Sequence, residues 1–418
     1  MFRRTVLISF RFAERRYRSS AVAPSARDAY VAEEVQKFCT ETPVERATTP
    51  PSSWFTDPAI YGLEKRTVFK WNWVAVGRTD QVASPGQYFT GVVGDEPFLV
   101  VRDKSNTLRG FFNVCRHHAA ILAGEDEGTA DAFTCCYHGW TYGLDGRLTK
   151  AMRLRGIQNF SARNFGLKPM AVKAWGPLVL VRPDGQEDGT DFETQVTSLK
   201  DQLDDLGFTS GLRFVERRRY RVNCNWKVVL DNYLDGGYHV EYLHRNLASN
   251  LSIDTYRTDV QELYSVQTCS GSAEDDQSMT RQRIGKTSIY GCVYPNLMIN
   301  RYGPWLDTNI ALPLTHDTTE VIYDYWLAEE FAQTLRGEAE LQEFVQTSLT
   351  ESDKVQQEDT FICERVQKGL RSSAYDVGRY APRVEMADHA FHLKLASDLK
   401  QGIRTDKLTN GITVPCMF

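Results

Sequence analysis

Short apolar runs separated by turn signals dominate the stretch between residues 72 and 182. Ser84-Pro85-Gly86 and Asp145-Gly146 are the clearest turn signals, and Pro183-Asp184-Gly185 marks the end of the stretch. Runs of this length that are rich in β-branched and aromatic residues are typical of strands. The pattern predicts a small all-β domain with strands at Trp73–Val76, Tyr88–Val92, Phe98–Arg102 and Leu178–Val181.

A different pattern begins near Thr190, where helical and extended stretches are longer and mixed. It opens with a helix, continues with a strand at Phe214–Val222, and ends in a long helical region from about Glu329 to Leu370. Further strands are predicted between these, at Ile289–Tyr294 and Val321–Leu327. This order favours an α+β domain in which a sheet wraps round a long helix.

At 418 residues the chain is long enough for two compact domains, because single cores stop growing at roughly 250 to 300 residues. We place the all-β domain at residues 72–183 and the α+β domain at residues 190–400. Residues 28–71 are expected to pack on the second domain, and residues 401–418 to form a tail. No apolar run approaches the roughly 18 residues needed to span a bilayer.

The formal net charge of -5 is unevenly distributed. The first 27 residues hold seven arginines and a single acid, Glu14, which leaves 42 basic and 53 acidic residues in the remainder. An acidic body disfavours nucleic acid as a partner. The Arg-rich, acid-poor start, with Phe2, Leu7 and Phe10 among its apolar residues, predicts a transit peptide at residues 1–27. We favour the mitochondrial matrix as the destination because hydroxylated residues are few; the chloroplast stroma and a plain basic tail are the alternatives.

Cysteine and histidine meet at two points of the predicted all-β domain. Cys115 and His117 form a C-x-H pair, and after seventeen residues Cys135 and His138 form a C-x2-H pair. Two thiolates and two imidazoles on paired loops suit a [2Fe-2S] cluster in which both cysteines bind one iron and both histidines the other. The alternative, a structural zinc site, pairs two cysteines on one loop and two histidines on another, so the spacing favours the cluster.

This arrangement resembles the signature of the Rieske family, in the wording Cys115-Arg116-His117-His118-Ala119 and Tyr137-His138-Gly139-Trp140-Thr141-Tyr142. The chain departs from the family at Cys136, where proline is usual. The C-x2-H spacing selects Cys135 as the ligand and leaves Cys136 a spare thiol.

A second pair of histidines, His239 and His244, lies in the predicted α+β domain among several carboxylates. Two histidines and one carboxylate on one face of an iron leave positions open for O2 and substrate. In a straight helix the two rings would lie roughly 140° apart, at about 100° per residue. Shared metal binding therefore requires a bulge or a helix end near Gly236-Gly237, and paired core histidines remain the alternative.

The third ligand is expected from the long C-terminal helical region. Val355, Ile362 and Val366 lie on one predicted apolar stripe, and Asp359 lies on the same stripe. A carboxylate on a buried face is costly unless it is paired or binds metal. Asp359 is therefore the candidate, and a buried Asp bonded to an Arg or to the backbone is the alternative.

Both segments also resemble the Rieske non-haem iron oxygenases, the ring-hydroxylating oxygenase alpha-subunit family. The similar wording is Asn225-Trp226-Lys227, Asp231-Asn232-Tyr233 through His239 and His244, and Glu358-Asp359 through Gln367-Lys368-Gly369. The resemblance implies a Rieske domain inserted into a helix-grip catalytic domain, and a mononuclear Fe(II) bound by His239, His244 and Asp359. It also implies a bridging acid, usually three residues before the first iron histidine. That position is Gly236 here, so we assign the bridge to Asp235.

Within the family, the chain resembles the plant-type choline monooxygenase group and, more distantly, bacterial carnitine oxygenases. The wording that carries this is Thr49-Pro50-Pro51-Ser52-Ser53-Trp54, Asp231 through His239, and Tyr294 through Asn300. The resemblance implies hydroxylation of choline or a related quaternary amine, in glycine betaine biosynthesis. It implies electrons from a ferredoxin or flavin reductase, and a head-to-tail homotrimer.

Several readings remain open on the sequence. Aromatic-ring hydroxylation is the alternative reaction, and a Rieske electron-transfer protein, which needs no second metal site, is the alternative class. A quaternary amine is held by aromatic faces, and the predicted sheet offers Tyr290, Tyr294, Tyr302 and Trp305. Since aromatics are equally typical of an ordinary core, none of the four is assigned to the site.

Overall fold

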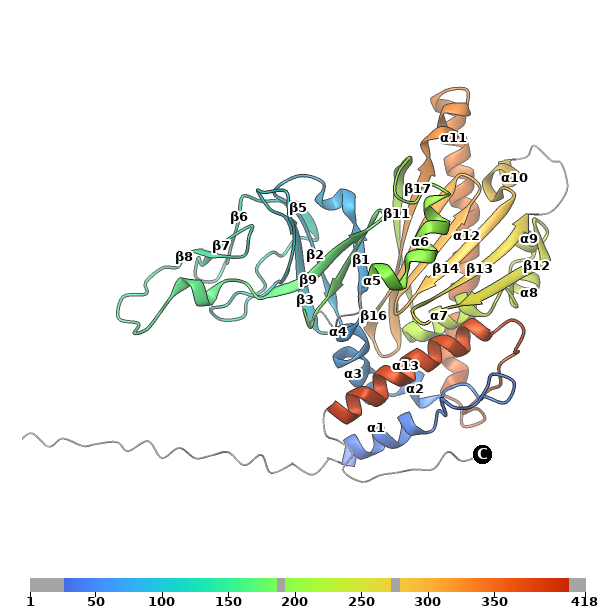
Figure 1. Ribbon diagram of the computed structural model, residues 1–418, viewed down its shortest axis with the longest axis horizontal. Helices are drawn as coiled ribbons and strands as arrows, with labels where there is room; N and C mark the ends of the chain where they lie inside the picture. The colour runs from blue at the N-terminus through green and yellow to red at the C-terminus, as the bar shows by residue number, and fades with distance from the viewer. Residues whose placement is uncertain (1–25, 186–191, 272–278, 406–418) are drawn as a thin grey trace, which may run out of the picture.

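The computed structural model describes residues 26–185, 192–271 and 279–405 (Figure 1). Its first half is an all-β domain built from two antiparallel sheets. The larger sheet has the order β1-β10-β9-β4-β3-β2-β5, so the first and last strands of the domain pair with each other. The strands are β1 (Val74–Arg78), β2 (Gln87–Val93), β3 (Glu96–Arg102), β4 (Leu108–Phe112), β5 (Glu127–Thr129), β9 (Pro169–Trp175) and β10 (Leu178–Arg182).

A smaller sheet forms the far end of this domain (Figure 1). It is a three-stranded meander of β6 (Ala132–Thr134), β7 (Thr141–Gly143) and β8 (Leu148–Lys150). A separate apolar cluster joins it to the larger sheet, with Leu99, Phe111, Phe133 and Tyr142 among its members. Cys115 and Cys135 belong to the same cluster.

The second half is built on a seven-stranded antiparallel sheet in the order β11-β17-β16-β15-β14-β13-β12. Strands β12 to β17 follow one another as a meander. The last of them, β17, pairs with β11, the first strand of the domain, which forms the edge of the sheet. The strands are β11 (Leu212–Val222), β12 (Leu251–Val260), β13 (Tyr264–Gly271), β14 (Thr287–Val293), β15 (Leu297–Tyr302), β16 (Trp305–Thr315) and β17 (Thr318–Ala328).

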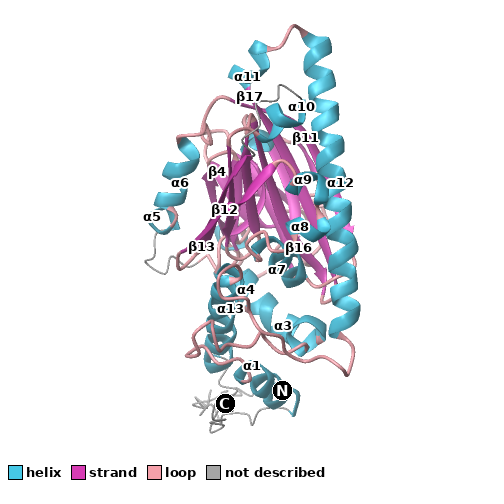
Figure 2. Ribbon diagram, turned by 90° about the vertical axis from the view of Figure 1, so that its right-hand side faces the viewer, coloured by secondary structure: helices cyan, strands magenta, loops and turns pink. Residues whose placement is uncertain are grey.

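Both faces of this sheet are covered. On one face lie α7 (Trp226–Leu234) and the long helix α12 (Glu338–Leu370), which runs beside the strands in Figure 2. On the other face lie α5 (Phe192–Gln195), α6 (Thr197–Asp204) and residues of β1 and β10, in one apolar cluster with the sheet. Because both faces are covered, β16 and β17 are buried along most of their length, including polar residues such as Asp307 and Asp324.

The predicted fold class is confirmed: a small all-β domain and a helix-grip α+β domain. The long helical region is divided, however, into α11 (Glu329–Thr334) and α12. Gly337 lies between them with φ +93° and caps α12. α11 ends at Leu335, which is extended, and the positive φ of Gly337 then redirects the chain into α12.

The N-terminal segment forms four helices that pack with the last helix, α13 (Met386–Thr405), at the base of the molecule (Figure 2). They are α1 (Ala26–Gln36), α2 (Ser53–Thr56), α3 (Pro58–Arg66) and α4 (Val68–Trp71). Glu64 of α3 forms a fully buried ion pair of 2.6 Å with Lys227 and accepts a hydrogen bond from Trp226. Removing one partner of such a pair typically costs about 3–5 kcal/mol, so this contact fastens the segment to α7.

None of the helices within residues 26–185, 192–271 and 279–405 is both long and apolar enough to cross a membrane. The predicted transit peptide and the predicted C-terminal tail lie almost wholly outside these ranges.

Candidate metal centres

Two loops of the all-β domain repeat the same backbone geometry around their cysteines. In each, the cysteine amide donates to the carbonyl five residues later, and the amide four residues later donates back to the cysteine carbonyl. The bonds are Cys115 N to Ala120 O (2.8 Å), Ala119 N to Cys115 O (3.0 Å), Cys135 N to Trp140 O (2.8 Å) and Gly139 N to Cys135 O (3.0 Å). Ala119 and Gly139 both have positive φ, +58° and +69°. The two tight turns present their side chains as matched halves of one site.

The thiols of these loops point inward and the imidazoles lie at the surface. Cys115 and Cys135 are 2% and 3% exposed, whereas His117 and His138 are exposed with ring centroids 4.6 Å apart. The ring of His117 stacks on Trp140 at 4.6 Å. Two buried sulfurs and two outward imidazoles fit a [2Fe-2S] cluster with its histidine-bound iron toward solvent.

The environment of Cys115 favours the thiolate, which is the form that binds iron. Burial acts to raise the pKa of the Cys115 thiol. Hydrogen bonds from the Tyr142 hydroxyl, 3.4 Å away, and from the backbone amide of His117 outweigh burial and lower that pKa. Cys136, by contrast, is exposed, whereas Cys135 is buried beside Cys115.

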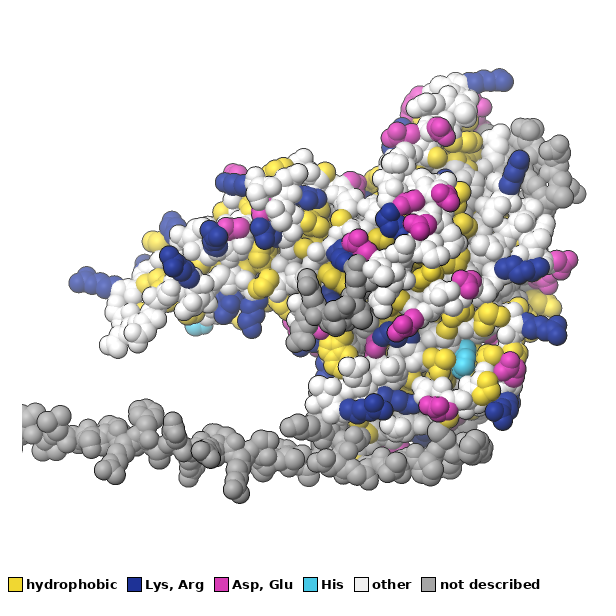
Figure 3. Space-filling view, viewed as in Figure 1, with side chains coloured by type: hydrophobic (Ala, Val, Ile, Leu, Met, Phe, Trp, Pro, Cys, Tyr) yellow, Lys and Arg dark blue, Asp and Glu magenta, His cyan; other side chains and the backbone are white. Residues whose placement is uncertain are grey.

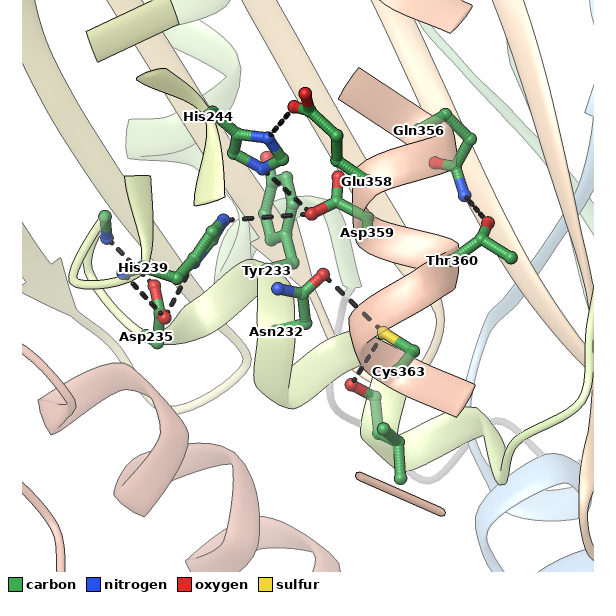
Figure 4. Close-up of polar contacts among 12 residues, drawn as sticks. Asn232, Tyr233, Asp235, His239, His244, Gln356, Glu358, Asp359, Thr360 and Cys363 are labelled. Carbon is green, nitrogen blue, oxygen red and sulfur yellow. Dashed lines mark hydrogen bonds and ion pairs between the residues drawn. The ribbon is translucent and has the colours of Figure 1, made fainter. Parts of the chain in front are cut away.

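The second site lies between α7, α12 and the large sheet (Figure 4). His239 and His244 flank a single helical turn, α8 (Val240–Leu243), rather than sharing one helix. Their ring centroids are therefore only 5.0 Å apart. Asp359 of α12 faces both rings, with its Oδ1 2.9 Å from His244 Nε2 and 3.8 Å from His239 Nε2.

One atom from each of these three residues lies within 4.8 Å of the other two. Two imidazole nitrogens and one carboxylate on one side of a point are the donor set of a facial triad. The helix ends lie at the two histidines, and not between them as predicted. His239 and His244 are the N-cap and C-cap of α8, and the turn between them is regular, with the His244 amide donating to Val240 O at 2.9 Å.

Each imidazole is held from behind by a second carboxylate. Nδ1 of His239 lies 2.7 Å from Asp235 Oδ2, and Nδ1 of His244 lies 2.7 Å from Glu358 Oε2. An ionised carboxylate only accepts hydrogen bonds, so each Nδ1 donates to its carboxylate and each Nε2 is the nitrogen left to face Asp359. Burial works to lower the pKa of His244, but the hydrogen bonds of Asp359 and Glu358 raise it on balance. The Nε2 position thus favours a cation.

The double glycine places Asp235 beneath His239. Asp235 ends α7, and Gly236 and Gly237 follow with φ of +69° and +73°. The carboxylate then accepts hydrogen bonds from the amides of Gly237 (3.1 Å) and His239 (3.2 Å). A Cβ on Gly236 would lie 2.2 Å from the carbonyl oxygen of Val384. Only glycine fits this turn.

The predicted apolar stripe on α12 is right only in part: Ile362 packs on the main apolar core and Val355 is partly buried, but the third residue is exposed. Val366 is 44% exposed. The face that is buried is largely polar and includes Ser352, Gln356, Cys363 and Gln367. These side chains are buried because they have partners: Ser352 with Tyr325 at 2.9 Å, and Gln367 with the amide of Asn225 at 2.8 Å. Asp359 lies on this largely polar face. The sequence therefore selected a residue that does face the histidines, although most of the buried face around it is not apolar as predicted.

A cavity of about 160 Å³ opens beside the three metal-facing residues. That is about the size of an apolar cavity that holds benzene. Five tyrosines are prominent in its wall: Tyr233, Tyr256, Tyr290, Tyr302 and Tyr323. Of the four aromatics offered by the sequence, Tyr290 and Tyr302 line the cavity. Tyr294 instead donates to Asp398 (2.9 Å), and Trp305 packs on Phe344.

Sequence reasoning assigned no role to Glu358, Tyr233 or Asp307, which all lie at this site or in its wall. Glu358 and Tyr233 stand inside the quoted motifs, next to residues that were assigned. Asp307 belongs to no motif in the sequence. Its hydrogen-bond partners, Asn300 and Tyr302, are recognisable only from its buried position on β16.

Two family profiles match the chain. The Rieske [2Fe-2S] domain matches residues 72–161, and the ring hydroxylating alpha subunit (catalytic domain) matches residues 209–401. The first match contains both cysteine loops, and the second contains His239, His244 and Asp359.

Similar proteins cover nearly the whole chain. The chloroplastic choline monooxygenase of Arabidopsis thaliana is 44% identical over 93% of this chain and 92% of its own, and that of Spinacia oleracea is 38% identical over 88% and 82%. The carnitine monooxygenase oxygenase subunit of Escherichia coli is 27% identical over 81% and 88%. A solved quaternary ammonium Rieske monooxygenase in complex with L-carnitine has a TM-score of 0.70 at 25% identity, covering 84% of this chain and 96% of that one.

These relatives correct the expected destination. The choline monooxygenases are chloroplastic, so the preference for the mitochondrial matrix is wrong. An Arg-rich, acid-poor, amphipathic start is common to mitochondrial and chloroplast transit peptides, and its composition does not separate the two organelles.

The two profiles and the long, 44% identical relative agree with the two sites built from the residues. A small-molecule substrate, O2 and an electron donor are what such an enzyme requires. This chain belongs to the Rieske non-haem iron oxygenases: it is an iron-dependent monooxygenase with a Rieske [2Fe-2S] cluster and a mononuclear iron, close to choline monooxygenase.

Proposed function

We propose that this enzyme hydroxylates the alcohol carbon of choline and forms betaine aldehyde hydrate, in glycine betaine biosynthesis. The observation that carries the proposal is the tyrosine-walled cavity beside His239, His244 and Asp359. Aromatic faces bind quaternary ammonium groups. Greater identity to choline monooxygenases (36–44%) than to carnitine monooxygenase subunits (26–27%) favours choline over carnitine.

In this proposal His239, His244 and Asp359 hold the mononuclear iron, and Cys115, His117, Cys135 and His138 hold the cluster. The iron supplies O2 activation, and the cluster supplies electrons one at a time. Asp235 and Glu358 fix the rings of His239 and His244 so that each Nε2 faces the metal position. The tyrosine walls exclude water and orient the alcohol carbon toward that position.

The overall reaction consumes choline, O2, two electrons and two protons, and yields betaine aldehyde hydrate and water. One C–H bond of the alcohol carbon is replaced by a C–O bond. One oxygen atom of O2 enters the product and the other leaves as water. The two electrons come from the external donor.

Asp235 is also the proposed bridge to a cluster histidine of a neighbouring subunit in a head-to-tail homotrimer. Three observations support this role. In Figure 1 the small sheet, which adjoins the cluster loops, lies on the left side of the molecule and helix α8 on the right, so electron transfer within one chain would be long. His117 and His138 are exposed, and the Asp235 side chain is 17% exposed. Asp235 therefore reaches both His239 and the surface.

The proposed electron donor is a ferredoxin. Exposed basic side chains surround the small sheet and the loop that packs beside the cluster, at the left of Figure 3. They are Arg147, Lys150, Arg153, Arg155 and Arg163. An acidic carrier would be steered to this end by its charge; a flavin reductase is the alternative donor.

Oxygen uptake by the reconstituted holoenzyme with a ferredoxin system tests the proposal. Choline should stimulate uptake and yield betaine aldehyde, while L-carnitine and an aromatic acid should not. Asp359→Ala should lose mononuclear iron and all uptake, whereas Asp353→Asn, on the same helix, should keep both. Uptake with carnitine or an aromatic acid but not with choline would contradict the choline assignment. Cluster reduction without uptake for any substrate would point to an electron carrier.

A further inference from the structure

A buried carboxylate stands in the wall of the tyrosine-lined cavity, away from the metal-facing residues. Asp307 of β16 is 2% exposed, and its two oxygens accept three hydrogen bonds. Asn300 donates at 2.6 Å, Asn309 at 3.1 Å and the Tyr302 hydroxyl at 2.7 Å. All three donors are neutral. They hold the carboxylate in one orientation and leave its charge uncompensated.

Within the described part of the chain, Asp307 forms no ion pair. Among the described residues that line the cavity, Arg283 of α10 (Met279–Ile284) is the one lysine or arginine. Its guanidinium forms an ion pair with Glu351 at 3.5 Å and lies 5.3 Å from the centre of the Tyr302 ring. Arg283 acts on Asp307 only through space. A buried charge without a close partner is costly, which indicates a cation that arrives with the ligand.

Aromatic rings surround the space in front of this carboxylate. The rings of Tyr256 and Tyr290 are parallel, with centroids 6.4 Å apart, and both line the cavity with Tyr302. Tyr233 donates to the side-chain oxygen of Asn300 at 2.8 Å. Through Asn300 it connects the Asp307 cluster to the segment that carries the metal-facing histidines. Ring faces combined with a carboxylate suit a quaternary ammonium, which has no N–H to donate.

We propose that Asp307 is the counter-ion of the substrate's quaternary ammonium group, and that Asn300, Asn309 and Tyr302 position it. This inference rests on the proposed function and adds the residue that discriminates charge. The ammonium lies against Asp307 and the tyrosine rings, which leaves the alcohol end to face His239, His244 and Asp359. The cavity then selects a cationic alcohol over an uncharged alcohol of the same shape.

Asp307→Asn tests this, because it removes the charge and keeps the shape of the side chain. The probes are choline and 3,3-dimethylbutan-1-ol, in which carbon replaces the charged nitrogen. Binding of both to the resting holoenzyme is measured by calorimetry, and turnover by product formation. In the parent enzyme choline should bind far more tightly than the isostere. In Asp307→Asn choline binding should weaken by at least about 30-fold, while isostere binding changes less than about threefold.

Asp254→Asn is the matched control, since it removes one negative charge from the exposed side of β12. It should leave the preference for choline unchanged. A thermal unfolding scan and the metal content confirm that each variant is folded and loaded. If Asp307→Asn does not fold, the variant Asn309→Ala is used in its place, and the affinity for tetramethylammonium is measured. Removing the Asn309 amide, which donates to Asp307, should weaken tetramethylammonium binding.

The outcomes separate the two proposals. If the parent enzyme neither binds nor oxidises choline, the proposed function is overturned. If the parent enzyme oxidises choline and Asp307→Asn keeps the full preference for choline over the isostere, only the role of Asp307 is overturned. Equal loss of both probes would assign Asp307 a structural role and would also overturn the inference.

Discussion

The carboxylate of Asp235 lies 2.7 Å from Nδ1 of His239 and also accepts that residue's backbone amide. One side chain thus sets both the tautomer of the ring and the turn that carries it. Asp235→Ala should leave the cluster bound and weaken mononuclear iron binding by about 10- to 100-fold, as loss of a histidine's carboxylate partner does. With the iron site filled, turnover should still fall by more than about 100-fold, because the proposed electron path between subunits is broken. Iron content, the EPR spectrum of the reduced cluster and single-turnover product yield measure this. Turnover within tenfold of the parent enzyme would remove Asp235 from the bridge.

Glu358 supports the second histidine in the same way, at 2.7 Å from His244 Nδ1. Glu358→Ala should weaken mononuclear iron binding by about 10- to 100-fold, because loss of the partner frees the ring to rotate. Iron retention during dialysis against a chelator gives the measurement. Glu364→Ala, two turns along the same helix and bonded to Asn223, is the control and should retain iron. Equal iron loss from both variants would contradict a specific role for Glu358.

Gly236 has no room for a side chain. Gly236→Ala places a Cβ 2.2 Å from the carbonyl oxygen of Val384 and forces alanine into a left-handed conformation, which costs about 1–2 kcal/mol before the clash is counted. The unfolding temperature and turnover should both fall. Gly369→Ala, in open space within α12, should instead stabilise by about 0.5–1 kcal/mol. A stable, fully active Gly236→Ala variant would show that the turn tolerates alternatives.

The two adjacent cysteines should behave differently. Cys135→Ser should abolish the visible absorption and EPR signal of the cluster, because Cys135 is buried beside Cys115. Cys136→Ser should keep both signals, since the Cys136 side chain is exposed. Loss of the signal from Cys136→Ser alone would reverse the ligand assignment.

Choline binding should weaken as the pH falls. Burial raises the pKa of Asp307, while hydrogen bonds from Tyr302 and its neighbours act to lower it. Above this raised pKa the carboxylate is charged and attracts the substrate; below it the neutral acid does not. Tyr302, Tyr323 and Tyr325 have pKa values well above 10 and stay neutral, and Arg283 is the cationic side chain of the cavity wall. The pH dependence should therefore be steeper in the parent enzyme than in Asp307→Asn; identical profiles would contradict this.

The folding stability contributed by Asp307 should change with pH in the opposite direction to choline binding. Because the folded pKa of Asp307 lies above its unfolded value, ionising it favours the unfolded chain. Raising the pH from the unfolded value through the folded one should remove stability, and choline should restore part of it. Unfolding temperatures with and without choline measure the difference.

Local information was enough for the cluster loops and for the fold class. The C-x-H and C-x2-H pairs lie on short turns whose geometry depends on a few neighbouring residues, such as Ala119 and Gly139. The strands flanking them follow from runs of β-branched and aromatic residues. The expectation that His239 and His244 could not both lie inside one long straight helix follows from their angular separation on a helix, and the structure places them at the two ends of the short helix α8.

Distance along the chain limited the rest. Asp359 meets His244 across 115 positions and from another helix, and its stripe was misjudged because polar residues such as Gln367 are buried by partners on remote elements. Asp307 belongs to no motif, and its burial, its three neutral donors and its tyrosine surroundings exist only once β15 and β16 pair. Spacing in the chain determines which ligands one turn can present. Packing alone decides which distant charge completes the site, because charge compensation depends on proximity in space.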